Sequence, residues 1–379
     1  MKEIQLPFID RLKATIGAKP SLIQVVIGPR QVGKTTGMKQ LLAQLPAQSF
    51  RYESADAIIG PPTAWIFEKW HEALSNSRTE LLVIDEVQKI ENWSDAVKKL
   101  WDEQQNHSRQ LQLVLLGSSS LDIQKGLSES LAGRFFVHKV YHWNAEESRQ
   151  AYNLSLDEYL RFGGYPGSYP FIQSTEQWLN YMNESIINPV IGKDILSQAR
   201  VKSPALFKQC FDIVCAYPAQ EISYTKLLGQ LQDRGNTDLV KHYLELFESA
   251  FLIKQIFKFS NRHVRSRTSS PKILPLCPAL FSAQQDADLN DEELGRVFEL
   301  SIGAALVRLP GRLFYWREKN AEVDYVYQNG KRLVAIEVKS GRKKSAKGLM
   351  KFCEQFSNAI PLVITRENYN EALRRIALE

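Results

Sequence analysis

The sequence is poor in the residues that cross-link small secreted domains and hold metal clusters. It has four cysteines and six histidines among 379 residues, and no cysteine pair has the C-x-x-C spacing of zinc or redox sites. This shortage excludes a disulfide framework and favours reduced, buried thiols, as in cytoplasmic proteins. All apolar runs fall short of the ~18–20 residues that span a bilayer, and the first residues lack the apolar core of a signal peptide. We therefore predict a cytoplasmic protein without membrane contact.

The remaining composition is that of an ordinary globular protein. Hydrophobic residues make up 44% of the chain and charged residues 24%, and the length predicts two or three domains. The formal net charge of +6 permits an anionic partner without requiring one.

The stretch GPRQVGKT at residues 28–35 matches the phosphate-binding pattern G-x-x-x-x-G-K-[ST] at every fixed position. An apolar run precedes it, and leucines at helical spacing follow, so the loop would lead from a strand into a helix. Its N–H groups could form a nest for phosphate oxygens, with Lys34 reaching the β- and γ-phosphates and Thr35 ligating Mg²⁺. A glycine-rich turn is the alternative, but the full match in this context favours ATP. The nucleotide-binding residues predicted here are Gly28, Pro29, Arg30, Gln31, Val32, Gly33, Lys34, Thr35 and Thr36.

A second apolar strand, LLVIDE at residues 81–86, ends in two carboxylates. Beside a phosphate-binding loop, Asp85 would hold the Mg²⁺ together with Thr35, and Glu86 would polarise the attacking water. Asp85 therefore joins the predicted nucleotide-binding and metal-binding residues. An acidic strand end that is merely solvated is the alternative.

Two further polar features follow in the sequence. The strand LQLVLLGSSS at residues 111–120 ends in serines, and Ser118 or, as our candidate, Ser119 would sense the γ-phosphate unless the serines form a plain turn. Arg134, in SLAGRFFV, could reach the γ-phosphate of a neighbouring subunit as an arginine finger. A surface cation or a helix-end partner explains Arg134 equally well.

The motifs GPRQVGKTT, IDEVQKIENW and GSSS followed by SLAGR, in this order, resemble bacterial and archaeal AAA+-type ATPases of the AAA_14 plus DUF4143 kind. The resemblance implies a doubly wound P-loop core in which Lys34, Thr35, Asp85 and Glu86 have the roles given above. Gly37 stands where the helix normally carries an apolar residue, so we expect slightly weaker packing there.

The middle of the chain changes to helices. YLRFGGYPGSYP at residues 159–170 is similar to the family's G-G-[YF]-P turn and predicts a helical lid, with Arg161 as a candidate second sensor of nucleotide. Between residues 204 and 275, three helices and a short strand are typical of a winged helix-turn-helix. Its third helix would be capped at Asn236, Thr237 and Asp238 and would present Lys241 and His242.

The wing of this segment would be KFSNRHVRSRTSSPK, which holds basic residues among no acidic ones. Such a stretch suits contacts to nucleic-acid phosphates. Winged helices also serve as protein-interaction or lid modules, which leaves that interpretation open. The basic residues are Lys258, Arg262, Arg265, Arg267 and Lys272.

A hairpin is the main feature of residues 292–345. Two alternating runs flank Asn329-Gly330, a strong short-range hairpin signal. A two-residue loop there would place residue 324 opposite residue 335. Because side chains alternate along a strand, Asp324, Glu337 and Lys339 would share one face. The other face would form a core of Val323, Tyr325, Tyr327, Val334, Ile336 and Val338.

The polar face of this hairpin predicts a second metal site. Asp324 and Glu337, as neighbours ~5–8 Å apart, could share Mg²⁺ or Mn²⁺, and Lys339 could activate water. The D…E-V-K pattern resembles the PD-(D/E)XK nuclease superfamily, and this resemblance makes Glu299, on the preceding helix, an additional metal ligand. Eight basic residues between 331 and 351 would favour a phosphodiester backbone. Charged open hairpin faces are also common, and nuclease-like folds often bind without cleaving.

Together these patterns predict an α/β chain of four parts: an ATPase core (1–145), a helical lid (146–203), a winged-helix-like domain (204–275) and a restriction-endonuclease-like α/β domain (276–379). We expect an Mg²⁺-dependent ATPase acting on DNA, branched or double-stranded, in repair, recombination or defence. A trans finger at Arg134 would require a homo-oligomer, of which a hexameric ring is one form. The alternative is a regulatory nucleotide switch whose C-terminal region binds a protein partner.

Overall fold

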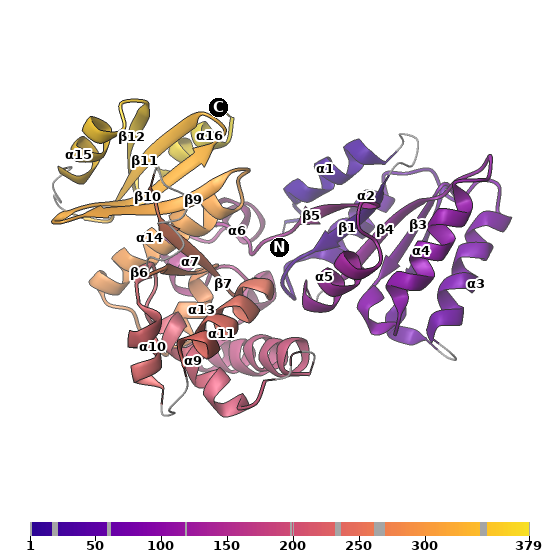
Figure 1. Ribbon diagram of the computed structural model, residues 1–379, viewed down its shortest axis with the longest axis horizontal. Helices are drawn as coiled ribbons and strands as arrows, with labels where there is room; N and C mark the ends of the chain where they lie inside the picture. The colour runs from indigo at the N-terminus through magenta and orange to yellow at the C-terminus, as the bar shows by residue number, and fades with distance from the viewer. Residues whose placement is uncertain are drawn as a thin grey trace. The chain divides into compact units, whose positions relative to one another are not determined.

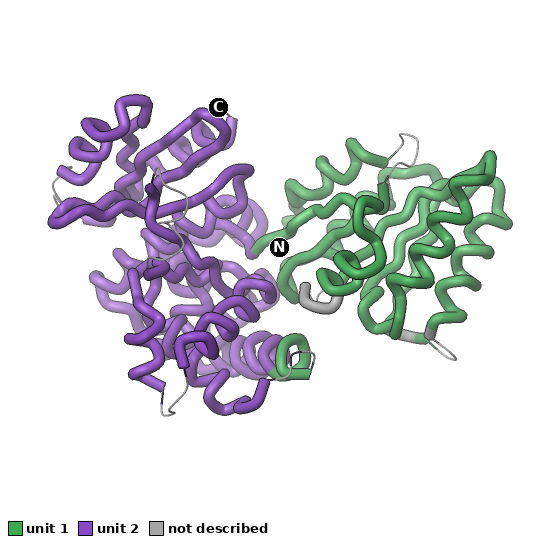
Figure 2. The backbone as a smooth tube through the Cα atoms, in the orientation of Figure 1, with its two compact units in different colours: residues 1–141, 192–198 green, residues 142–191, 199–379 purple. Residues whose placement is uncertain are grey.

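The structure is a computed structural model that describes residues 2–16, 22–58, 62–117, 120–197, 199, 201–231, 236–260, 270–341 and 347–378. The chain divides into two compact units (Figure 2). The first comprises residues 1–141 and the short segment 192–198, and the second comprises residues 142–191 and 199–379.

The first unit is built on a five-stranded sheet of order β2-β3-β4-β1-β5, in which all recorded pairs are parallel (Figure 1). The central strands read as continuous apolar runs because helices cover both faces of a parallel sheet. This arrangement confirms the predicted α/β core. Its strands are β1 (Ile23–Ile27), β2 (Phe50–Ser54), β3 (Leu81–Asp85), β4 (Gln112–Gly117) and β5 (Phe135–Lys139). Its helices are α1 (Pro7–Thr15), α2 (Lys34–Leu42), α3 (Pro62–Ser75), α4 (Trp93–Gln104) and α5 (Ser120–Glu129), with short 3₁₀ turns η1 (Ala55–Ala57) and η2 (Val87–Lys89).

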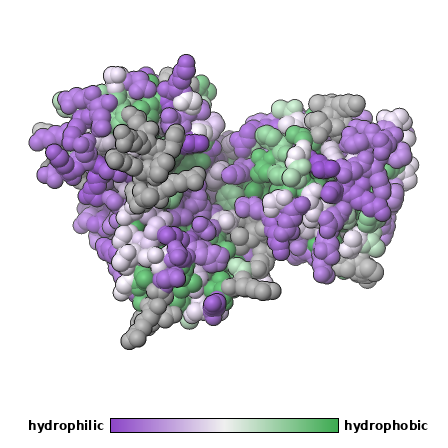
Figure 3. All heavy atoms as spheres, viewed as in Figure 1, coloured by the Kyte–Doolittle hydropathy of each residue, from purple (hydrophilic) through white to green (hydrophobic). Residues whose placement is uncertain are grey.

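Helices α3 and α4 show why these segments fold as they do. Their apolar residues, among them Trp70 and Trp101, are buried, while hydrophilic side chains cover this region on the face drawn in Figure 3. An apolar stripe on one side and charge on the other is the pattern of a helix that packs on a sheet.

Gly37 lets α1 pack closely on α2. A Cβ at this position would lie 2.7 Å from the ring of Phe8, and Phe8 is buried. The expectation that Gly37 weakens packing is therefore wrong, since the missing side chain makes the room that the Phe8 ring fills.

The second unit begins with helices and ends in mixed structure. Its helical elements are α6 (Ala145–Tyr152), α7 (Leu156–Phe162), η3 (Pro166–Phe171), α8 (Thr175–Asn180), the π-helix η4 (Tyr181–Ile187), α9 (Pro204–Ala216), α10 (Tyr224–Gln230), α11 (Thr237–Ser249), α13 (Pro278–Ser282), α14 (Asp291–Val307), α15 (Lys347–Gln355) and α16 (Tyr369–Leu378). A further π-helix, η5 (Val190–Leu196), starts in the second unit and ends in the segment 192–198 of the first.

One seven-stranded sheet runs through the second unit, in the order β12-β11-β10-β9-β7-β8-β6. Strands β7 and β9 pair in parallel through Phe257–Phe314 and Lys258–Tyr315, so the predicted boundary at residue 275 falls inside a continuous sheet. The strands are β6 (Gln220–Glu221), β7 (Ile253–Lys258), β8 (Lys272–Pro275), β9 (Arg312–Glu318), β10 (Ala321–Asn329), β11 (Arg332–Lys339) and β12 (Ala359–Thr365).

The hairpin of β10 and β11 has a different register from the predicted one. Tyr325 faces Ile336 and Asn329 faces Arg332, so the turn consists of Gly330 and Lys331. Gly330 has φ +57°, and glycine is favoured at the first central position of a type II′ turn. The predicted turn is therefore wrong by one residue, and each cross-strand partner shifts by two. Because the shift is even, residues of β11 keep their predicted faces.

A bulge in β10 changes the predicted core. The pairing with β9 shifts between Val323 and Val326, and Val323 packs with Trp316 in the cluster that α15 covers. The prediction for Val323 is therefore wrong, because the extra residue turns it to the other side. The remaining core residues do pack together, against α14 and α16: Tyr325, Tyr327, Val334, Ile336 and Val338.

Among the helices in the described part of the chain, none has the combination of length and apolar character that crossing a bilayer requires.

Candidate functional site

The phosphate-binding loop connects β1 to α2 at the carboxyl edge of the parallel sheet. Gly33 caps α2 with φ +90°, and Gln31 also has a positive φ, of +60°. A Cβ on Gly28 would lie 2.3 Å from the carbonyl oxygen of Val140, so only glycine fits where the loop leaves the strand. The backbone thus curls as an anion-binding nest requires.

Lys34 lies inside this loop. Its Nζ donates hydrogen bonds to the carbonyl oxygens of Gly28, at 2.9 Å, and Pro29, at 2.5 Å, and the side chain is buried. Burial lowers the pKa of Lys34 to about 8, although the carboxylates of Glu86 and Asp85 oppose the shift.

Thr35 and Asp85 come together although they are 50 residues apart in the sequence. The Thr35 hydroxyl donates to Oδ2 of Asp85 at 2.8 Å, and Asp85 is buried. A hydroxyl and a carboxylate side by side are the hard oxygen ligands that Mg²⁺ takes in proteins, so these residues fit the ion that the sequence predicts.

Tyr52, which the sequence did not single out, contacts the same carboxylate. Its hydroxyl donates to Oδ2 of Asp85, and Lys39 of α2 lies 5.6 Å from the centre of its ring. Burial raises the pKa of Tyr52, and the hydrogen bond to Asp85 raises it further. The tyrosine therefore remains a hydrogen-bond donor to Asp85.

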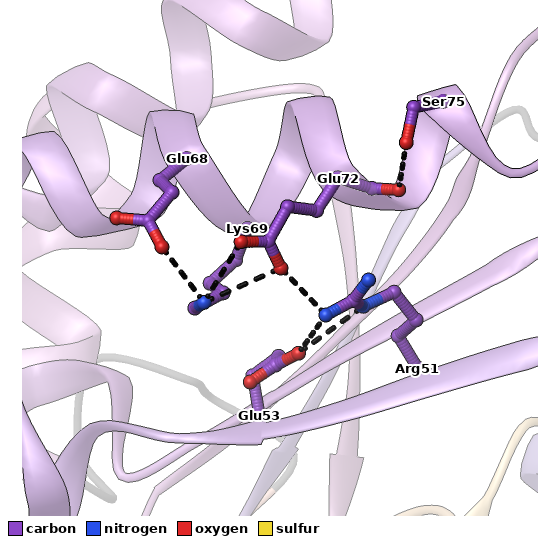
Figure 4. A network of polar contacts seen from close by, with 6 residues as sticks. All are labelled: Arg51, Glu53, Glu68, Lys69, Glu72 and Ser75. Atoms are coloured by element: carbon purple, nitrogen blue, oxygen red, sulfur yellow. Dashed lines mark hydrogen bonds and ion pairs between the residues drawn. The ribbon is translucent and has the colours of Figure 1, made fainter.

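An ion-pair network fixes the strand that carries Tyr52. Arg51 bridges Glu53 at 2.9 Å and Glu72 of α3 at 2.6 Å (Figure 4). Lys69 joins the same network through Glu72, at 3.1 Å. Because neighbouring side chains point to opposite faces of a strand, Arg51 and Glu53 face α3 while Tyr52 faces the loop. This alternation in FRYES is the sequence signal that could have identified Tyr52.

Glu86 follows β3 in a left-handed conformation, with φ +56°. Its N–H donates to Oδ1 of Asp85 at 2.9 Å, and its Oε2 accepts a hydrogen bond from Nε2 of Gln88 at 2.7 Å. A non-glycine residue in this conformation is strained by about 1–2 kcal/mol, and such strain is concentrated at functional sites.

Arg30 has a partner that lies far away in the sequence. Its Nε is 2.5 Å from Oδ2 of Asp194, and its Nη2 binds the other oxygen, so the ion pair is bidentate. Asp194 belongs to the segment 192–198 of the first unit and is buried. The hydrogen bond to Asp194 raises the pKa of Arg30 above its usual value.

Of the remaining predicted ATPase residues, two lie outside the described part of the chain and two have partners of their own. Ser118 and Ser119 lie outside the described residues, just after β4 ends at Gly117. Arg134 forms a bidentate ion pair with Asp102 of α4, at 2.7 and 3.0 Å. Arg161, in the second unit, donates to the carbonyl oxygen of Leu289 at 3.2 Å.

The second unit brings the predicted acidic residues into one cluster. Glu299 lies on α14, Asp324 on β10, and Glu337 and Lys339 on β11. Oδ2 of Asp324 accepts the N–H of Val338 at 2.7 Å, and Glu337 pairs with Lys339 at 2.9 Å. Within the described ranges, no three His, Cys, Asp or Glu side chains are arranged to hold a metal ion.

Lys272 completes this cluster from β8. Its Nζ lies 2.5 Å from Oε1 of Glu299 and 3.3 Å from the carbonyl oxygen of Asp324. The prediction that Lys272 is a wing residue open to phosphates is therefore wrong, because its side chain is 3% exposed. Arg262, Arg265 and Arg267 of the wing lie outside the described residues.

The electrostatics of the cluster follow from its burial. Burial raises the pKa of Glu299, and Lys272 opposes this shift. Burial also raises the pKa of Glu337. For Lys272 burial alone would lower the pKa, but the charges of Glu299 and Asp324 together outweigh it and raise the pKa.

Helices α9, α10 and α11 are followed by the antiparallel strands β7 and β8, with β6 pairing on β8. Asn236 caps α11 by accepting the N–H of Leu239 at 2.9 Å. On the exposed side of α11, Lys241 is paired with Asp238 at 2.9 Å and lies near the ring of Tyr224. This side therefore carries acidic as well as basic groups.

Comparisons with known proteins divide the chain into three regions. Residues 21–148 match the family model of an AAA domain, AAA_14. Residues 153–291 match a domain of unknown function, DUF8612, and residues 294–378 match another, DUF4143.

Similar proteins occur in an archaeon and in mycobacteria. An uncharacterised protein of Methanocaldococcus jannaschii is 24% identical over 343 residues, covering 84% of this chain and 75% of that protein. An uncharacterised protein of Mycobacterium tuberculosis is 27% identical over 339 residues, covering 87% of this chain and 72% of that protein.

Among solved structures, the replication initiator DnaA bound to AMPPCP and single-stranded DNA has a TM-score of 0.31 and 15% identity, covering 64% of this chain and 86% of that one. A RuvB variant of Thermotoga maritima has a TM-score of 0.32 and 14% identity, covering 65% and 85%. Both TM-scores are too low to support an inference about this chain. The AAA family match over residues 21–148, together with the loop and the acidic strand end, supports an AAA+-type ATPase domain in the first unit, and residues 294–378 match DUF4143.

Proposed function

We propose that the first unit hydrolyses ATP in an Mg²⁺-dependent reaction at the edge formed by the loop, Asp85 and Glu86. The observation that carries the proposal is the Thr35–Asp85 hydrogen bond of 2.8 Å, which joins the two predicted metal ligands next to the buried Lys34. Bound Mg²⁺ would supply positive charge to the phosphates and would be held by the Thr35 hydroxyl and the Asp85 carboxylate.

The residues of the loop would then bind and orient the substrate. The N–H groups of residues 28–35 would bind phosphate oxygens at the N-terminus of α2. Lys34 would exchange its two loop carbonyls for oxygens of the β- and γ-phosphates. Glu86, once released by Gln88, would accept a proton from the attacking water.

Two substitutions test this mechanism. Lys34→Ala should abolish ATP binding, and Glu86→Gln should keep it while lowering turnover by at least about 100-fold, as removal of a general base does. Lys99→Ala, which removes an exposed lysine from α4, is the matched control and should behave as wild type. Normal turnover by Glu86→Gln would show that the assignment of Glu86 is wrong.

We further propose that ATP hydrolysis serves an action on DNA, with the second unit as the DNA-contacting part. The net charge of +6 is compatible with this proposal, and the order of α9, α10, α11, β7 and β8 agrees with the predicted winged helix. The eight basic residues between 331 and 351 support binding to a phosphodiester backbone. A homo-oligomer with Arg134 as a trans finger belongs to the same proposal, and the four free cysteines fit a cytoplasmic location.

The second candidate is a nucleotide-dependent switch whose second unit binds a protein. The mixed charge on the exposed side of α11, where Asp238 neutralises Lys241, favours it. An ATPase assay with double-stranded, single-stranded and branched DNA, together with gel shifts over a salt series, separates the two. Absence of stimulation and of binding at low salt, with and without a non-hydrolysable ATP analogue, would leave only the switch.

A further inference from the structure

We propose that the acidic cluster of the second unit is a metal-free ionic lock, in which the ammonium group of Lys272 takes the place of a divalent cation. The D…E-V-K hairpin implies a metal held by Glu299, Asp324 and Glu337, but the arrangement of these residues does not fit one. This proposal concerns the second unit and is independent of ATP hydrolysis in the first.

The position of Lys272 carries the inference. Its Nζ is 2.5 Å from Glu299 and 3.3 Å from the carbonyl oxygen of Asp324, and it lies 4.9 Å from the ring centre of Tyr325. A carboxylate, a carbonyl dipole and an aromatic face are three groups that stabilise a cation. The ammonium is therefore held between the helix and the strand that should supply the metal ligands.

One oxygen of each of the three carboxylates is already engaged. Asp324 accepts the N–H of Val338 through Oδ2, and Glu337 is paired with Lys339. A divalent ion requires oxygen ligands at ~2.0–2.6 Å. An ion bound to Glu299 at that distance would compete for the same volume with the ammonium of Lys272.

The charges of the cluster lead to the same conclusion. The three carboxylates are faced by two ammonium groups, those of Lys272 and Lys339, so two of the three negative charges are already compensated. Lys272 cannot swing into solvent to admit a metal, because its side chain is 3% exposed and starts from a strand inside the sheet. A divalent ion that entered the cluster would therefore lie beside the buried ammonium group of Lys272, and the two positive charges would repel each other.

The lock also joins regions that belong to different family models. Lys272 lies in residues 153–291, whereas Glu299 and Asp324 lie in residues 294–378. The ion pair therefore ties strand β8 to α14, and the contact with the carbonyl oxygen of Asp324 ties it to β10. These contacts fix the position of the two regions relative to each other.

Metal binding tests the proposal directly in the full chain. Mn²⁺ binding is measured by titration of nucleotide-free protein carrying Asp85→Asn, which removes the carboxylate of the ATP site. We expect the same Mn²⁺ binding with and without the additional change Asp324→Ala. One bound Mn²⁺ that is lost on Asp324→Ala or on Glu299→Gln would overturn the lock, as would Mn²⁺-dependent DNA cleavage that these changes abolish.

A double-mutant cycle tests the ion pair itself. Lys272→Met and Glu299→Gln should each lower the melting temperature, because each leaves a partner charge, buried at Lys272 and partly buried at Glu299, without its ion pair. The double variant should melt above the Lys272→Met protein, since it removes both charges of the pair and not just one. Strictly additive shifts would contradict the lock. If Lys272→Met fails to fold, recovery of a folded double variant gives the same answer, and the Mn²⁺ titration does not use this variant.

Discussion

Arg30 of the phosphate-binding loop and Asp194, 164 residues later, form a bidentate ion pair within the first unit. Asp194 lies in a short segment whose flanking residues on both sides belong to the second unit. The loop that would bind the phosphates is thereby tied to a part of the chain that no local motif connects with it.

This ion pair should stabilise the first unit in an asymmetric way. Arg30→Ala leaves the carboxylate of Asp194 buried without its partner, and we expect it to lower the free energy of unfolding by about 2 kcal/mol, less than a fully buried pair because Arg30 is partly exposed. Asp194→Asn should cost less, since the guanidinium can be hydrated. Urea unfolding of both variants and of the double variant provides the comparison, and equal effects of the two single changes would refute the argument.

The hydroxyl of Tyr52 should position Asp85. Tyr52→Phe removes only this donor, so we expect ATP affinity to stay within about twofold and turnover in Mg²⁺ to fall by roughly 10- to 150-fold, as loss of one hydrogen bond to a charged group implies. Steady-state kinetics and ATP titration measure the two effects separately. Tyr181→Phe, in the second unit, is the control. Unchanged turnover of Tyr52→Phe would mean that Thr35 alone orients the carboxylate.

Arg134 can be tested as a finger by mixing subunits. A Lys34→Ala subunit cannot bind ATP but supplies Arg134, and an Arg134→Ala subunit has the reverse defect. If the finger acts in trans, a mixture of the two inactive proteins should regain ATPase activity. Asp102→Asn, which frees Arg134 from its ion pair, should remain active. If the mixed oligomer forms but does not regain activity, Arg134 is not a trans finger, and its role is limited to the ion pair with Asp102.

His138 should make the first unit sensitive to acid. Its ring is buried on β5 with Nε2 at 2.8 Å from Oε1 of Gln24, and burial, aided by the charge of Arg11, lowers its pKa to about 4. In the unfolded chain the pKa is about 6.5, so the unfolded state binds more protons between these values and stability falls as the pH drops from 6.5 to 4. The loss should reach on the order of 3 kcal/mol at pH 4.

The measurement is urea unfolding at pH 7, 6, 5 and 4. His138→Gln should lose this part of the pH dependence, while the exposed His107→Gln should keep it. Parallel curves for wild type and His138→Gln would show that the buried ring does not contribute.

The sequence predicted those parts of the ATPase site that depend on neighbours in the chain. Lys34 and Thr35 follow from a contiguous motif, and Asp85 from a strand with a carboxylate at its end. Asp194 could not be found in this way, because its contact joins distant segments and the residue belongs to no motif. Tyr52 is indicated only by the alternation of side chains in FRYES, which the prediction did not use. Ser119 stays a prediction, since it lies outside the described residues.

The hairpin shows which part of a strand prediction is robust. The period of two placed Glu337 and Lys339 on a common face, and this survived the changed turn because the register moved by an even number of residues. The bulge after Val323 carries no signal in the hydrophobic pattern, so the position of Val323 was wrong. Lys272 was misjudged because a basic stretch in a sequence does not reveal which of its members enters the sheet.

The continuous sheet of the second unit has a consequence for dissecting the chain. A fragment that begins at residue 294 would carry β9 without β7, its partner on one side. Its open backbone groups would form a template for pairing with other chains, and such edges lead to aggregation. The boundary between the two family models therefore does not mark a point where the chain can be cut for expression, and residues 204–378 would have to be kept together for a soluble fragment.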